Sequence, residues 1–261
     1  MLSKPYVGVT GITSEDEARQ VQEFFFHAGY DDKSTHMPMI GILASYKTLH
    51  EQSENKRYPT IHNVPKILRQ IDNKIFRVVH YHTREHATLY DQVEMFGEFH
   101  DHSLLDGLQL NVVWPFPKEV ERIKSSFPGL RLVLWINETM MGTGVPAEVL
   151  VRLREYRGFV DYFLLDPSGG HSKEFRIADV AEWYLDIDSS LPWSIGGIAG
   201  GFSAGNVEEK VRDFSLSLGR NSFSIDAEGL LRDKVGKGFG NDKLNLKKTH
   251  DYIRAAALLL K

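Results

Sequence analysis

The chain has 261 residues, a formal net charge of −4 and 42% hydrophobic residues. This length suits two ordinary domains or one barrel of eight strand–helix units, and no basic stripe supports a dedicated nucleic-acid binder. The absence of cysteine excludes disulfides, thiolate chemistry and cysteine-ligated zinc. Without a signal-peptide core or an apolar run near ~20 residues, the sequence predicts a cytoplasmic protein that contacts no membrane.

The segment YVGVTGITSEDEA, residues 6–18, predicts a strand, a glycine turn and the start of a helix. Its first residues are aromatic and β-branched, and Gly11 ends the run. Ser14 followed by Glu17 is the pattern of a capping box. A strand that leads directly into a capped helix is a βα unit, and Thr10 stands at its junction.

Strand-like and helix-like segments then alternate to the end of the chain. The predicted strands are 6–9, 37–45, 76–82, 105–113, 131–137, 160–166, 193–201 and 223–229. The predicted helices are 15–27, 63–71, 89–99, 117–127, 146–156, 175–185, 205–218 and 246–260. Because the strands are apolar on both faces, we expect a parallel sheet covered by helices.

Eight regular units predict an α/β fold of the (β/α)8 TIM-barrel type, with a doubly wound open sheet as the main alternative. No linker or composition shift divides the chain, so we expect one domain over residues 1–261. The longest irregular piece, residues 46–62, is interpreted as an insertion at the rim.

In such a barrel the functional residues lie at the carboxyl ends of the strands. The polar and glycine residues at those ends are Thr10, Ser45, His82, Asn111, Asn137, Asp166, Gly200 with Gly201, and Asp226 to Gly229. Asp166 before PSGG suits either a turn or a catalytic carboxyl group. Gly200 and Gly201 before a helix suit either an anion site or a tight turn.

Histidines and acidic residues supply further candidates. His80 and His82 share one face of the third strand, and His82 at its end could act as a base near neutral pH. A surface or hydrogen-bonded role is the alternative to metal binding, and we expect no metal site. Asp226 and Glu228 also share a face, where they could bind a sugar or a cation or pair with a lysine of residues 234–238.

Three segments, taken in order, resemble phosphoribosylanthranilate isomerase of tryptophan biosynthesis. They are VTGITSEDEA at the first strand, FLLDPSGGHSKEF at the sixth and GIAGGFSAGNVEE at the seventh, with weaker echoes in LQLN and SIDAEG. The resemblance implies a barrel that catalyses an Amadori rearrangement of an aminoaldose phosphate. It also implies that Asp166 is the general acid and that Gly200 and Gly201 belong to a phosphate loop.

The sequence departs from this family at three positions. The family's base is a cysteine where this chain has Thr10, whose hydroxyl cannot act as an unaided base. Glu228 replaces a small hydroxyl residue in a loop that should receive phosphate. Arg57, the match for the arginine that grips the substrate carboxylate, is reached only across an insertion.

Two hypotheses follow, and whether the chain is an enzyme is left open. The first is an aldose–ketose isomerase, an intramolecular oxidoreductase, acting on an aminosugar phosphate or related phosphosugar. Its expected residues are Asp166, Thr10 and His82 for catalysis, Arg57, Asn111, Asp226 and Glu228 for substrate, and Gly200, Gly201 and Gly229 for phosphate. The second is a diverged paralogue that binds a small polar ligand without this chemistry. We expect a small-molecule partner, no cofactor and no nucleic acid, with a homodimer as an open alternative.

Overall fold

Eight parallel strands pair in chain order, and the last strand pairs with the first, which closes the sheet into a barrel. The computed structural model describes residues 4–52, 55–142, 146–169, 176–238 and 240–261. The barrel strands are β1 (Tyr6–Thr10), β2 (Met37–Ser45), β3 (Phe76–His82), β4 (Gly107–Asn111), β5 (Arg131–Asn137), β6 (Tyr162–Asp166), β7 (Ile195–Ala199) and β8 (Ser224–Ala227). The predicted TIM barrel is therefore confirmed, and an open sheet is excluded.

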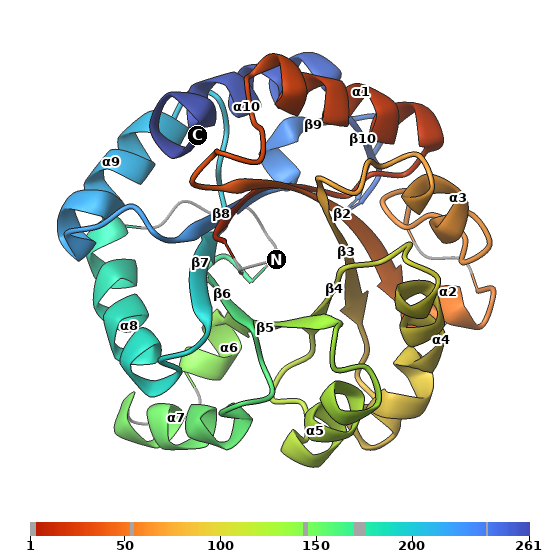
Figure 1. Cartoon of the computed structure of the whole chain (residues 1–261), viewed down its shortest axis with the longest axis vertical. Coiled ribbons are helices and arrows are strands. Elements are labelled where there is room, and N and C mark those ends of the chain that lie inside the picture. Colours follow the sequence, from red (N-terminus) through yellow and green to blue (C-terminus); the bar gives the residue numbers. More distant parts are fainter. Residues whose placement is uncertain (1–3, 53–54, 143–145, 170–175, 239) are drawn as a thin grey trace.

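Helices form a ring around this barrel (Figure 1). The main helices are α1 (Glu15–His27), α3 (Val64–Leu68), α4 (Leu89–Asp101), α5 (Pro117–Ser126), α7 (Pro146–Leu153), α8 (Ile177–Ser190), α9 (Val207–Leu218) and α10 (Leu246–Leu260). Shorter turns of helix are α2 (Tyr46–Leu49), α6 (Glu138–Met141), η1 (His86–Thr88), η2 (Arg154–Tyr156) and η3 (Gly229–Leu231). No helix within the described ranges is both long and apolar enough to cross a bilayer.

The first helix begins as the sequence predicts, with one difference at its cap. Ser14 Oγ accepts a hydrogen bond from Glu17 N at 3.2 Å. The Glu17 carboxylate, however, accepts from Thr13 N at 2.7 Å and from the Thr13 hydroxyl at 2.9 Å. The predicted capping box is thus only half formed, because Thr13 offers Glu17 two donors at once.

Alternation along β1 separates two apolar layers. Val7 and Val9 belong to the cluster between the barrel and its helices, whereas Tyr6 belongs to the cluster inside the barrel. The Tyr6 ring packs against those of Phe76 and Tyr162 at centroid distances of 5.8 and 5.6 Å. These three rings fill the barrel interior below the carboxyl ends of the strands, where the polar side chains gather.

A two-stranded antiparallel hairpin follows the barrel, made of β9 (Arg232–Lys234) and β10 (Asp242–Leu244). No sequence pattern described above predicts this hairpin. Asp242 joins the hairpin to the rim insertion, since its carboxylate accepts from Arg57 Nη2 at 2.7 Å and from Arg232 Nε at 2.6 Å. Arg232 Nη1 also donates to the carbonyl of Gly11 at 2.7 Å, so this ion-pair network ties the β1 and β2 loops to the hairpin.

The ion-pair network makes Asp242 a stability determinant. The side chains of Asp242, Arg57 and Arg232 are each less than a tenth exposed. Asp242→Asn removes the anion that two buried guanidinium groups share, although Arg57 still pairs with Glu228, and we expect it to lower the free energy of unfolding by roughly 3–5 kcal/mol. Urea denaturation followed by circular dichroism measures this change.

Asp233→Asn is the matched control on the same hairpin. The Asp233 side chain is 41% exposed and pairs with Lys248, so we expect its loss to change the urea midpoint much less than the loss of Asp242 does. Equal urea midpoints for the two variants would contradict the role given to Asp242.

Candidate functional site

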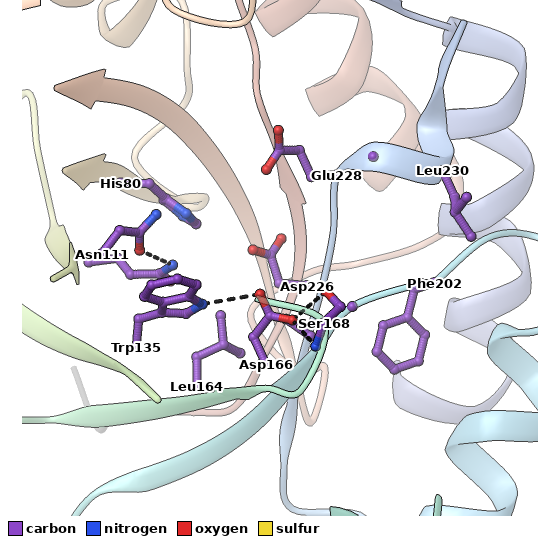
Figure 2. A pocket seen from close by; sticks show the side chains of 15 residues that line it. His80, Asn111, Trp135, Leu164, Asp166, Ser168, Phe202, Asp226, Glu228 and Leu230 are labelled. Atoms are coloured by element: carbon purple, nitrogen blue, oxygen red, sulfur yellow. Dashed lines mark hydrogen bonds between the residues drawn. The ribbon is translucent and has the colours of Figure 1, made fainter. Parts of the chain in front are cut away.

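The carboxyl ends of the strands surround a cavity of about 70 Å³ in the mouth of the barrel (Figure 2). Seven of the residues expected at the site from sequence line it, and they are Asn111, Asp166, Gly200, Gly201, Asp226, Glu228 and Gly229. The remaining lining residues are His80, Gln109, Trp135, Leu164, Ser168, Ala199, Phe202 and Leu230. The fold therefore brings together residues that are more than a hundred positions apart in the chain.

Thr10 points into the barrel, as the alternation of β1 predicts. Its hydroxyl donates to Asp226, with Oδ1 at 2.9 Å and Oδ2 at 3.0 Å, and it lies 3.4 Å from His80 Nε2. Thr10 is only 1% exposed and is not one of the residues that line the cavity. It therefore acts on the cavity through Asp226.

Gly8 provides the space that Asp226 occupies. A Cβ atom at Gly8 would lie 2.7 Å from Asp226 Oδ1 and 2.5 Å from Met39 Cε. No larger residue fits at that position without moving the carboxyl group. The inward glycine of β1 thus sets the depth of the cavity floor.

Burial changes the ionisation of the two groups beside Thr10. Desolvation, together with the nearby charges of Glu228 and Asp166, raises the pKa of Asp226 to about 8, against the opposing hydrogen bond from Thr10. Burial lowers the pKa of His80 to about 3. At neutral pH the cavity therefore presents a protonated Asp226 and an uncharged His80.

Asp166 accepts hydrogen bonds from two neighbouring residues, Ser168 and Trp135. Its Oδ1 accepts from Ser168 N at 3.0 Å and from Ser168 Oγ at 2.6 Å, and its Oδ2 accepts from Trp135 Nε1 at 3.2 Å. Figure 2 shows these bonds and the Asp226 carboxyl group beside them. Asp166 therefore lines the same cavity as the protonated Asp226, and hydrogen bonds from Ser168 and Trp135 orient its carboxyl group.

A tight loop at the end of β7 forms the next wall. Gly200 and Gly201 have φ angles of 99° and 62°, which favour glycine. A Cβ atom at Gly200 would lie 2.9 Å from Asp166 Oδ1, so the backbone must approach that carboxylate closely. Asn206 Nδ2 and Lys210 Nζ both donate to the Gly201 carbonyl, at 2.8 and 3.1 Å, which fixes the loop ahead of α9.

The negative charge of Glu228 is balanced from outside the cavity. Arg57 Nη1 donates to Glu228 Oε1 at 2.8 Å, so the partner of Glu228 is Arg57 rather than a lysine of residues 234–238. Arg57 also donates to Asp242 and does not line the cavity. The structure thus places Arg57 behind the wall of the site, and the substrate contact expected for it stays a prediction.

His82 also lies apart from the cavity. Its side chain is exposed at the end of β3, and its Nδ1 is 3.0 Å from the carbonyl oxygen of Asn111. Two other strand-end residues cap short helices: Ser45 Oγ accepts from Thr48 N, and Asn137 Oδ1 accepts from Met140 N. Within the described part of the chain, no group of three or more histidine or acidic residues could hold a metal ion.

Sequence reasoning did not single out Gln109, Trp135 or Ser168 as site residues. Gln109 and Trp135 each lie two positions before a strand-end asparagine, and therefore on the same inner face. The spacing of two residues from a strand-end asparagine is the sequence signal that could have identified both residues. Ser168 follows Asp166 by two positions, where a hydroxyl commonly bonds an aspartate in a turn.

Comparisons with known proteins establish the fold. Phosphoribosyl anthranilate isomerase from Thermotoga maritima is 18% identical, with a TM-score of 0.62 over 98% of this chain and 100% of that chain. Another phosphoribosyl anthranilate isomerase, in complex with reduced 1-(o-carboxyphenylamino)-1-deoxyribulose 5-phosphate, is 17% identical, with a TM-score of 0.61 over 98% and 100%. Tryptophan synthase subunit alpha from Legionella pneumophila is 12% identical, with a TM-score of 0.63 over 98% and 93%. No family model and no curated protein matches the chain.

The raised pKa of Asp226 has a defined effect on stability. An aspartate that titrates near 3.8 in the unfolded chain and near 8 in the folded protein makes the folded state bind more protons between those values. Stability contributed by this group is therefore full below about pH 4 and is lost as the pH rises to about 8.

Asp226→Asn removes this titration and keeps an acceptor for Thr10. At pH 8 we expect the variant to be more stable than the wild type by up to a few kcal/mol, since each pKa unit corresponds to about 1.4 kcal/mol. The variant should also lose the decline between pH 5 and 8. Chemical denaturation across that range measures both effects, and parallel stability curves for the two proteins would contradict the assignment.

Proposed function

We propose that this protein is an acid–base catalyst that isomerises a phosphorylated sugar derivative at the mouth of the barrel. The observation that carries the proposal is the pairing of a protonated Asp226 with an Asp166 that accepts hydrogen bonds from Ser168 and Trp135, both carboxyl groups lining one cavity. Isomerisation of an aldose to a ketose needs one group that gives a proton and one that takes a proton, within reach of the same sugar. The likeness in fold to phosphoribosyl anthranilate isomerases is consistent with this reaction class.

The two carboxyl groups divide the proton transfers. Asp226 donates its proton to the ring oxygen of an aminoaldose as the ring opens, and Asp166 then removes the proton from C2. Asp166 next returns that proton to C1, while the C2 hydroxyl proton passes to Asp226 as the ketone forms. Every proton is returned, so the net change is an isomerisation. This assignment gives Asp226 the acid role that the resemblance gave to Asp166, because Asp166 receives three hydrogen bonds.

Thr10 is a positioning residue in this proposal. Its hydroxyl fixes the Asp226 carboxyl group and stabilises the anion that forms after proton donation. In this proposal the base is Asp166 on β6 rather than a residue on β1. A threonine is therefore sufficient at the position where the family has a cysteine base. The proposed cytoplasmic location of the protein agrees with a water-soluble sugar phosphate as its substrate.

The proposed phosphate position is the wall formed by Gly200, Gly201 and Gly229. The backbone there comes close to the cavity, and α9 begins at Val207 with its positive dipole end toward this side of the barrel. The charge of Glu228, which would oppose a phosphate, is offset by Arg57 at 2.8 Å. The phosphate would lie at this wall, toward the mouth of the barrel.

One observation favours a second candidate, the binding of an unphosphorylated polar ligand. Three carboxyl groups, those of Asp166, Asp226 and Glu228, line the cavity, and no lysine or arginine is among its described lining residues. Such a lining attracts neutral or cationic ligands more than dianions. The two candidates therefore differ in whether binding requires a phosphate.

Thermal-shift measurements with ribose 5-phosphate and ribose separate these candidates. We expect ribose 5-phosphate to raise the melting temperature and Gly201→Asp to abolish that rise by placing a carboxylate at the phosphate position. Gly219→Asp is the matched control, because Gly219 has a similar φ of 66° and faces open space at the end of α9. Stabilisation by ribose alone, unchanged in Gly201→Asp, would favour the unphosphorylated ligand.

Catalysis by Asp166 is tested with the aminoaldose phosphate 5-phosphoribosylanthranilate and with its non-carboxylated aniline analogue. Asp166→Asn should lower turnover at least ~100-fold on whichever is converted, while the folded state persists. Asp161→Asn, just before the other end of β6 where Asp161 pairs with Lys124, should keep near-normal turnover. Equal turnover in Asp166→Asn and wild type would make Asp166 a turn residue.

A further inference from the structure

A buried side-chain oxygen on the β4 side of the cavity lacks the hydrogen bond that such atoms normally have. Gln109 is 3% exposed and lies on the inner face of β4, in register with His80 on β3 and Val133 on β5. Its Nε2 donates to Asn111 Oδ1 at 2.8 Å. Its Oε1 has no hydrogen-bond partner among the described residues.

The position of this oxygen distinguishes it from the other buried polar atoms in the same condition. Those atoms belong to Tyr30, Tyr184, Ser190, Asn241 and Tyr252, none of which lines the cavity, whereas Gln109 does. Buried acceptors are nearly always paired in folded proteins, and an exception at a cavity wall suits a group that a ligand completes. The bond to Asn111 fixes the amide of Gln109 beside the cavity.

We propose that Gln109 Oε1 accepts a hydrogen bond from an uncharged hydroxyl or N–H group of the substrate, at the end of the substrate remote from its phosphate. Gln109 lies on β4 and the Gly200–Phe202 loop follows β7, three strands further around the closed barrel, and Asp166 and Asp226 also line the cavity. A sugar phosphate that reaches the loop would place its other end against Gln109. This inference rests on the proposed function for the direction of the substrate.

The surroundings of Gln109 disfavour an anionic group there. His80 is uncharged, because burial holds its pKa near 3. Arg57, which the resemblance assigned to a substrate carboxylate, is bound to Asp242 and Glu228 behind the wall. A carboxylate beside Gln109 Oε1 would meet another acceptor, and no lysine or arginine is among the described residues that line the cavity, which is unfavourable in a buried site.

Trp135 completes this part of the cavity. Figure 2 shows its indole nitrogen directed at Asp166, and the ring itself lines the cavity near Asn111. An indole provides a flat surface for a sugar or aromatic ring. The substrate class that fits is therefore a sugar phosphate whose amino substituent carries an uncharged donor rather than a carboxylate.

Three matched ligands test the inference. They are 1-deoxyribulose 5-phosphates with an o-carboxyphenylamino, an o-hydroxymethylphenylamino or a phenylamino group at C1. We expect the wild type to bind the hydroxymethyl compound at least about tenfold more tightly than either of the others, by calorimetry. Gln109→Met has similar volume and no acceptor, and it should bring the hydroxymethyl and phenyl compounds to equal affinity.

Preference for the carboxyphenyl compound, or an unchanged hydroxymethyl preference in Gln109→Met, would overturn the inference. If none of the three ligands binds the wild type, the phosphosugar proposal fails instead, and the melting temperature then tests Gln109 by itself. Gln109→Met removes an unpaired acceptor together with the donor to Asn111 Oδ1, so its melting temperature should stay close to that of the wild type. Gln92→Met is the control, since both amide atoms of Gln92 are bonded and its loss should clearly lower the melting temperature. A melting temperature for Gln109→Met as low as that for Gln92→Met would show that Gln109 is already satisfied and would overturn the inference.

Discussion

The site depends on one carboxyl group that the closed barrel keeps away from water. Asp226 lies on the inner face of β8, and closure of the sheet pairs that strand with β1 at Gly8. Gly8 leaves the space for the carboxyl group, and Thr10 provides a hydroxyl on the same face of the same strand. Desolvation then keeps the proton on Asp226 at neutral pH. In an open sheet β8 would be an edge strand, so the Asp226 carboxyl group would be exposed to water and would ionise.

The other charges of the site are arranged around that protonated group. Asp166 accepts hydrogen bonds from Ser168 and Trp135, which orient its carboxyl group within its own part of the barrel. Glu228 is paired with Arg57, which Asp242 holds from behind. The ion-pair network outside the cavity thus balances an acidic residue at its rim, and the described residues that line the cavity include no lysine or arginine. Asp166 and Asp226 line that cavity together.

Much of this architecture follows from sequence patterns, because those patterns record burial. Apolar strands that alternate with amphipathic segments predicted the barrel, and the period of two along β1 predicted that Thr10 points inward while Val7 and Val9 face the helices. The short helices α2 and α6 and the β9–β10 hairpin were missed, since three or four residues are too few to show a period.

The partners within the site could not be predicted in the same way. Arg57 and Glu228 are 171 positions apart, and only the folded rim brings them together. The protonation of Asp226 depends on its depth in the barrel, which the chain records only indirectly through Gly8. A prediction limited to the strand ends selects Asn111 on β4 and leaves out Gln109. Gln109 is the preceding residue on the inner face of that strand, and it lines the same cavity.

Infrared spectroscopy of the carboxyl groups tests the central claim most directly. At pH 7 the wild-type protein should show the C=O stretch of a buried protonated carboxyl group, which disappears as the pH passes about 8. The band should be absent from Asp226→Asn. In Asp166→Asn it should remain at low pH but disappear at a lower pH than in the wild type, because the nearby negative charge is gone. A wild-type spectrum without this band at pH 7, or a band that is lost in Asp166→Asn and kept in Asp226→Asn, would contradict the account.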